Sequence, residues 1–213
     1  MKVRGTRQWL LAAAIFVLGG AGLVVRQRVR PFRDVPPSPA FAVIREMGHG
    51  HGVAPIDGRF LYDEILRRRC TRGLDLGTAS GYSALWAALA LRRNGGTLVT
   101  VEIDEPTARA AAARFRRAGL DGVISLRVAD AVEEIPKLEG SFDYVFMDVG
   151  VPLNKEFLDL LRGRIRPGGV ILAHNAELFP WTQPEFLHAI TTDPGLETSF
   201  YGWIFRISCT VRR

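Results

Sequence analysis

The hydrophobic and polar positions of this chain follow one pattern before residue 31 and another after residue 41. Residues 9–25 (WLLAAAIFVLGGAGLVV) form an unbroken run of 17 uncharged residues. Beyond residue 41, short apolar segments alternate with longer helical stretches. This alternation predicts strands at 73–76, 97–102, 123–128, 144–147 and 170–173, helices at 82–91, 106–118, 154–161 and 184–191, and one or two closing strands within 198–211.

Strands that alternate with helices in this way are typical of βαβ units, which form a parallel sheet with helices on both faces. Gly119 follows the helix predicted at 106–118, and glycine is the residue most often found just after the end of a helix. The segment Arg166-Pro-Gly-Gly169 predicts a turn that leads into the strand at 170–173. The sequence shows no internal repeat. We therefore expect an α/β, doubly wound fold.

The apolar run at 9–25 predicts a membrane anchor. As a helix it would reach about 25 Å, which is short of the roughly 30 Å hydrocarbon core but within the range of spanning helices. Trp9 and the flanking arginines suit the membrane interfaces. A cleaved signal peptide and a buried core helix are the alternatives. The chain thus divides into an anchor or signal helix (1–30), a proline-rich linker (31–40) and a folded domain (41–213).

The net charge of +6 comes from the N-terminal segment. Residues 1–34 hold seven basic residues and one acid, whereas residues 35–213 hold 21 basic and 21 acidic residues. The domain has no basic bias, so we expect no nucleic-acid binding. Cys70 and Cys209 match neither a disulfide framework nor the spacing of zinc ligands.

Acidic residues and glycines gather where the predicted strands end, which is the edge at which open α/β sheets bind ligands. Asp75 precedes a turn formed by Gly77 and Gly81, Glu102 ends the second strand, and Asp130 follows the third. The turn lets a ligand approach the backbone, and an acid at the position of Glu102 can accept hydrogen bonds from the hydroxyls of a ribose. A nicotinamide enzyme shares these features, but Asp75 would repel its pyrophosphate. In the alternative interpretation, Asp75 and Asp130 only cap helices.

Three segments resemble the S-adenosylmethionine (SAM)-dependent O-methyltransferases of the catechol and caffeoyl-CoA type: GVAPIDGRFL, DLGTASGYSALWAALALRRNGGTLVTVEIDE and GSFDYVFMDV. The resemblance covers about residues 45–211. It implies a seven-stranded, Rossmann-like methyltransferase sheet whose last strand is antiparallel, here preceded by the N-terminal hydrophobic helix. The cofactor-binding residues that it implies are Val53, Asp57, Asp75, Gly77, Gly81, Tyr82, Ser83, Glu102, Asp130 and Asp148.

The same resemblance implies a divalent metal held by an Asp after the fourth strand and an Asp-Asn pair after the fifth. Asp148 and Asn175 match this pattern, but His174 replaces the middle ligand. The lysine base of the family is also replaced, and Lys155 is the nearest lysine in the sequence. Three interpretations stay open: a metal site formed by Asp148, His174 and Asn175, a metal-free site in which His174 is the general base, and a site that has lost its chemistry.

We therefore expect a SAM-dependent O-methyltransferase that acts on a hydroxyl of a small aromatic or catechol-like acceptor. Its expected catalytic residues are His174, Asp148 and Lys155. Because SAM is a cytosolic metabolite, the expected localisation is a single-pass membrane protein whose domain faces the cytoplasm, and a homodimer is one expected state. The alternatives are a catalytically silent SAM-binding protein at the membrane and an NAD(P)-dependent oxidoreductase.

Overall fold

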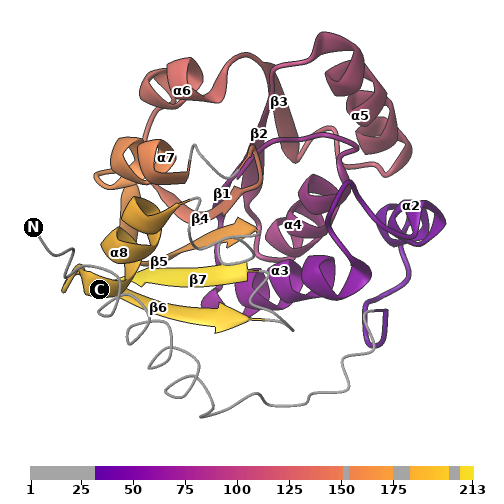
Figure 1. The fold of residues 1–213 in the computed structure, drawn as a ribbon. Coiled ribbons are helices and arrows are strands. Elements are labelled where there is room, and N and C mark those ends of the chain that lie inside the picture. The colour runs from indigo at the N-terminus through magenta and orange to yellow at the C-terminus, as the bar shows by residue number, and fades with distance from the viewer. Residues whose placement is uncertain (1–31, 151–153, 175–182, 202–206) are drawn as a thin grey trace, which may run out of the picture. The chain divides into compact units, whose positions relative to one another are not determined.

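The computed structural model describes residues 32–150, 154–174, 183–201 and 207–213 (Figure 1). The chain from Pro31 to Arg213 forms one compact unit. Its helices are α2 (Pro39–Met47), α3 (Pro55–Arg68), α4 (Tyr82–Arg93), α5 (Glu105–Arg117), α6 (Ala131–Glu134), a 3₁₀ turn (Ile135–Lys137), α7 (Asn154–Leu161) and α8 (Pro184–Thr192). Its strands are β1 (Arg72–Leu76), β2 (Thr97–Glu102), β3 (Ile124–Val128), β4 (Phe142–Met147), β5 (Ile165–His174), β6 (Leu196–Tyr201) and β7 (Ile207–Arg212).

The strands form one seven-stranded sheet in the order β3-β2-β1-β4-β5-β7-β6. β1 pairs in parallel with both β2 and β4, and β7 pairs antiparallel with β5 and β6. The chain runs outward from β1 to β3 and then crosses back to β4 on the other side of β1. The carboxyl ends of β1 and β4 therefore form the topological switch point, where sheets of this kind bind ligands.

Helices cover both faces of the sheet, and the alternation of side chains along the strands separates two cores (Figure 1). On β4, Tyr144 and Phe146 pack into the core that α2, α3, α4 and α5 cover. Val145 and Met147 pack into the opposite core, under α7 and α8. A strand segment that is buried on both faces needs apolar residues on both, which explains the continuous apolar run from Tyr144 to Met147 in β4. The expected α/β fold with helices on both faces is confirmed.

The structure also contains helices that the sequence pattern did not predict. α2 begins at Pro39, within the predicted linker, because Ser38 accepts a hydrogen bond from the Phe41 N–H and caps the helix. α3 was read only as part of a family motif. Its buried side chains Leu61 and Ile65 lie four residues apart, as one face of a helix requires. The division of the chain into three segments remains a prediction.

The turn predicted at 166–169 is part of a longer strand. β5 begins at Ile165, which pairs with Phe142, while the next pair joins Val170 to Tyr144. Four residues of β5 thus face one of β4, and they bulge out of the ladder. Gly168 has a φ of 78° within this bulge, which explains why a glycine-rich turn sequence lies inside a strand.

The predicted membrane localisation needs a correction. In the described part of the chain, no helix is both long and apolar enough to cross a membrane. The longest, α3, has 14 residues and reaches about 21 Å, against a hydrocarbon core of roughly 30 Å. This finding contradicts the expected single-pass membrane protein with its domain facing the cytoplasm. The predicted span itself, residues 9–25, and the N-terminal hydrophobic helix lie outside the described residues.

Candidate functional site

A tight turn connects β1 to α4 at the switch point. Gly77 has a φ of 90° and Gly81, the N-cap of α4, has a φ of 82°. A side chain on Gly77 would place its Cβ 2.6 Å from the Asp148 carbonyl oxygen, so the turn can lie against the end of β4 only with glycine there. The turn is further fixed because the N–H groups of Gly77 and Thr78 both donate to the carbonyl of Val101.

Asp75 is completely buried beneath this turn. Its Oδ2 accepts a hydrogen bond from the Thr100 hydroxyl at 2.6 Å, and Thr100 in turn lies 2.6 Å from the Thr78 hydroxyl. Its Oδ1 accepts no hydrogen bond within the described residues. Burial raises the pKa of Asp75 to about 7, although the bond from Thr100 opposes the rise. Asp75 caps no helix, so the alternative of a mere capping role does not apply to it.

Glu102 connects the end of β2 to the same turn. Its Oε2 accepts a hydrogen bond from the Ala79 N–H at 2.8 Å, and its Oε1 accepts one from the Asp104 N–H at 3.0 Å. Ala79 has a φ of 43°, an unusual value for a residue with a side chain. The carboxylate is therefore held in one orientation beside a strained backbone segment.

Asp130 does cap a helix, because its carboxylate accepts a hydrogen bond from the Val132 N–H at the start of α6. The ends of β2 and β3 expose two large apolar side chains that sequence reasoning missed. Ile103, after β2, is 68% exposed, and Val128, at the end of the neighbouring β3, is 52% exposed. The signal that could have found them is a large apolar residue within two positions of the acid that ends or follows each strand.

Tyr82 and Ser83 begin α4 and are both buried. The Tyr82 hydroxyl donates a hydrogen bond to the Gly48 carbonyl, and a side chain on Gly50 would place its Cβ 2.7 Å from the Tyr82 Cβ. Tyr82 thus holds the segment between α2 and α3 against α4. The predicted cofactor residue Val53 lies in that segment and is also buried.

Three predicted site residues meet at the ends of α3, β4 and β5. The His174 ring is fully shielded from solvent, with its Nδ1 3.2 Å from Asp148 Oδ1 and its Nε2 3.7 Å from Asp57 Oδ2. Burial lowers the pKa of His174, but the two carboxylates raise it more, to about 9. The side chain of Asp57 is 3% exposed and that of Asp148 is 23% exposed. The cluster is a buried imidazole between two carboxylates.

This geometry does not fit a metal ligand. Each ring nitrogen of His174 faces a carboxylate oxygen, so neither offers a lone pair to a metal ion. Among the described residues, no group of three His, Cys, Asp or Glu side chains is placed to hold a metal. The third predicted ligand, Asn175, lies outside the described residues. Lys155 lies on α7 and pairs with Asp159 at 2.5 Å, and no hydrogen bond or ion pair within the described chain joins it to Asp148.

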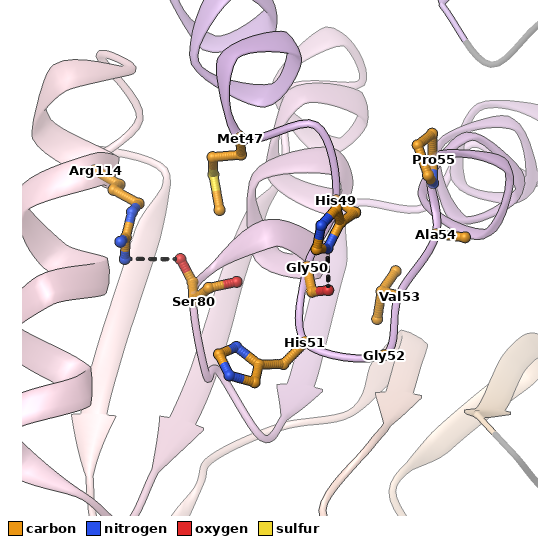
Figure 2. Close-up of a pocket in the computed structure, with 10 residues that line it drawn as sticks. All are labelled: Met47, His49, Gly50, His51, Gly52, Val53, Ala54, Pro55, Ser80 and Arg114. Atoms are coloured by element: carbon orange, nitrogen blue, oxygen red, sulfur yellow. Dashed lines mark hydrogen bonds between the residues drawn. The ribbon is translucent and has the colours of Figure 1, made fainter.

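A pocket of about 620 Å³ opens beside the segment between α2 and α3 (Figure 2). Met47 and residues 49–55 form one wall, and Ser80 and Arg114 form another. Figure 2 shows the Arg114 guanidinium reaching the Ser80 carbonyl, to which it donates a hydrogen bond at 3.2 Å. His49 and His51 also line the pocket. Among the residues that the structure describes, its walls therefore carry imidazole and guanidinium groups and no carboxylate.

A family model described as a methyltransferase domain matches residues 74–176. These residues are similar to a methyltransferase domain. The match begins in β1 and ends just after His174, so the methyltransferase domain includes the switch point, Glu102 and Asp148. The resemblance inferred from the sequence is confirmed.

Relatives of the methyltransferase domain carry names that agree with this. A catechol O-methyltransferase of Niastella koreensis is 36% identical over 129 residues, which are 58% of this chain and 57% of that protein. A caffeoyl-CoA O-methyltransferase of Stellaria longipes is 26% identical over 130 residues, which are 58% of this chain and 54% of that protein. The chain thus spans less than two thirds of either relative.

The fold of the methyltransferase domain is also found in a crystal structure of an O-methyltransferase from Bacillus cereus in complex with S-adenosylhomocysteine (SAH). The TM-score is 0.71 at 21% identity, and the match covers 97% of this chain and 99% of the other. At this identity the likeness concerns the fold. The expected homodimer stays a prediction.

Proposed function

We propose that the methyltransferase domain transfers a methyl group from SAM to a hydroxyl of a small, aromatic or catechol-like acceptor. The observation that carries this proposal is the hydrogen bond from the Ala79 N–H to Glu102. It joins the glycine turn to Glu102, the acid that ends β2. The turn and the carboxylate therefore lie at a fixed distance from each other, and a bound nucleoside could contact both. The catechol and caffeoyl-CoA O-methyltransferases among the relatives support the class of acceptor.

The described residues fit each part of SAM by their chemistry. The carboxylate of Glu102 can accept hydrogen bonds from the ribose hydroxyls. The exposed side chains of Ile103 and Val128 offer an apolar surface for adenine. Asp130 lies beside that surface and can accept a hydrogen bond from the adenine amino group. At the other end, ionised Asp75 would favour the cationic sulfonium and ammonium groups.

Other predicted cofactor residues act through the backbone in this proposal. Gly77 and Gly81 let the cofactor approach the turn, and the first N–H groups of α4, at Tyr82 and Ser83, point toward an anion such as a carboxylate. Val53 belongs to the segment between α2 and α3, which would cover the bound cofactor. The side chain of Tyr82 holds that segment, so its own role is in shaping the site.

When bound, SAM supplies a methyl group on a sulfonium, which is already activated for transfer. The chain then has to align the acceptor oxygen and receive the hydroxyl proton as the new carbon–oxygen bond forms. Asp148 is suited to this task because its side chain is the most exposed of the three in the Asp57–His174–Asp148 cluster. The pocket beside residues 47–55 provides space for the acceptor.

Calorimetric titration with SAH and with NAD⁺ tests the cofactor. We expect SAH to bind with a stoichiometry of one and NAD⁺ to give no heat of binding. Methyl transfer from SAM to a panel of catechols then tests the activity, with and without EDTA. Binding of NAD⁺ instead of SAH would refute the cofactor, and SAH binding without turnover of any acceptor would favour a silent SAM-binding protein.

A further inference from the structure

We propose that Asp57 is a positioning residue, which holds His174 against Asp148 and so orients Asp148 toward the acceptor hydroxyl without the help of a metal ion. This inference rests on the proposed methyl transfer, because it explains how the transfer site is built. It gives Asp57 a role other than the cofactor contact that the family resemblance implies.

The surroundings of Asp57 favour a partner within the protein. Asp57 is 2% exposed and lies in the first turn of α3. Its Oδ2 accepts a hydrogen bond from the Ala54 N–H at 2.9 Å and also lies 3.7 Å from His174 Nε2. The N-terminus of a helix stabilises a carboxylate, which explains how this charge is tolerated in the interior. The carboxylate thus faces the imidazole and the start of its own helix.

His174 transmits the position of Asp57 to Asp148. A neutral imidazole has one donor and one acceptor nitrogen, and here an acceptor nitrogen would point its lone pair at a carboxylate. The arrangement is therefore favourable when both nitrogens carry protons, with Nδ1 donating to Asp148 and Nε2 at ion-pair distance from Asp57. Asp148 then receives a directed hydrogen bond on Oδ1, and the rest of its carboxylate is left for the acceptor.

The packing around the ring leaves it little freedom. The His174 ring lies 6.1 Å from the ring of Phe146, centroid to centroid, and its side chain is fully shielded from solvent. A Cβ on Gly52 would lie 3.8 Å from His174 Cε1, so the segment before α3 runs directly past the ring. A group held on several sides in this way can orient its neighbour at a small cost in entropy.

Asp57→Asn tests the inference, with Asp63→Asn as the matched control. Asp63 lies on the same helix but pairs with Arg59 near the surface. In Asp57→Asn we expect kcat to fall about 10- to 100-fold, because misplacing a reacting group by about 1 Å costs a factor of this order. The KM for the acceptor and the Kd for SAH should stay within about twofold, and Asp63→Asn should match the wild type in all three. In the wild type, EDTA and added Mg²⁺ or Mn²⁺ should leave kcat unchanged.

A second variant separates positioning from a general loss of structure. If Asp57 acts through His174, Asp57→Asn should lower kcat no further in a protein that already carries His174→Gln. Additive losses in the double variant would overturn the inference. So would a loss of SAH affinity in Asp57→Asn, which would make Asp57 a cofactor ligand, or a wild-type kcat that requires a metal ion.

A readout that does not depend on turnover distinguishes this inference from the proposed function. In the ¹⁵N spectrum of histidine-labelled, SAH-bound protein at pH 7, we expect both ring nitrogens of His174 to be protonated, with His174→Gln identifying the signals. Asp57→Asn should shift these signals, and Asp63→Asn should not. An unprotonated ring nitrogen in the wild type would overturn the inference even if methyl transfer is demonstrated. Protonated nitrogens without any turnover would refute only the proposed function.

Discussion

Replacing Gly58 with alanine should destabilise the protein, although the same change in most helices stabilises them. Gly58 lies within α3, directly after Asp57, and faces α4. A Cβ at this position would lie 2.3 Å from both Cδ1 and Nε1 of Trp86 and 3.0 Å from its Cε2. Ordinary carbon contacts are about 3.5–4.0 Å, so one of the two helices has to move.

The magnitude follows from two opposing terms. Alanine in place of glycine inside a helix contributes about 1 kcal/mol in favour of folding. Overpacking of a filled core costs about 1–3 kcal/mol. The upper part of that range applies here because Trp86 is fully buried and rigid, with the rings of Phe32, Phe41 and Tyr82 within 6.5 Å, centroid to centroid. We expect a net loss of about 1–2 kcal/mol, which lowers Tm by about 2–8 °C in a domain of this size.

Thermal unfolding followed by circular dichroism measures this loss. Gly163→Ala is a suitable control, because nothing lies within 4 Å of a Cβ there and its backbone is not in the left-handed region. It should leave Tm unchanged or raise it slightly. The double variant Gly58→Ala/Trp86→Phe, with a smaller ring, should lose less stability than the two single losses added together. A Tm for Gly58→Ala at or above the wild-type value would refute the reasoning about the α3–α4 contact.

Three further changes test the site. Burial raises the pKa of Asp75 to about 7 in the folded protein, against 3.8 as the ordinary value, so its contribution to stability is fully present below about pH 4 and is lost as the pH rises through 7. Urea unfolding between pH 4 and 8 should show this loss in the wild type and not in Asp75→Asn. The same dependence of the free energy of unfolding on pH in both proteins would contradict the prediction. Glu102→Gln should weaken SAH binding about tenfold or more in calorimetry, because hydrogen bonds to a charged group are worth about 1.5–3 kcal/mol; unchanged affinity would place the ribose elsewhere. Arg114→Met removes the hydrogen bond to the Ser80 carbonyl and should weaken SAH binding about threefold to tenfold. Arg116→Met, on the same helix, is the control. Equal effects of the two substitutions would mean that only the charge of the helix matters.

The strands and most helices could be predicted because their signals are local. The predicted helix at 154–161 and the predicted strand at 97–102 have the same bounds in the structure. Of the helices that were missed, α2 begins within the proline-rich segment 31–40 and α3 contains the family motif around Asp57, where the sequence shows no clear helical period. Prolines at the first helical position begin both α2 and α3, and this signal could have found them.

The candidate site could be predicted in its parts but not in its contacts. The expectation that Asp75, Glu102, Asp130 and Asp148 lie where strands end agrees with the structure, because the carboxyl ends of parallel strands share one edge of the sheet. The partners of His174 were not predictable, since Asp57 lies far from it in the sequence, on a helix that the pattern did not reveal. The sequence therefore left the three interpretations of His174 open.

The sequence by itself determined the order of the strands and of most helices, the α/β class, the family resemblance and the residues at the ligand-binding edge. These depend on side-chain period, turn chemistry and short motifs, each contained within a few neighbouring residues. Only the tertiary structure decided what those residues do to one another: that Asp75 is buried beneath the turn, that Glu102 is tied to it, and that His174 stands between two carboxylates. The pKa and the protonation of a side chain depend on burial and nearby charges, and both arise only when distant segments of the chain pack together.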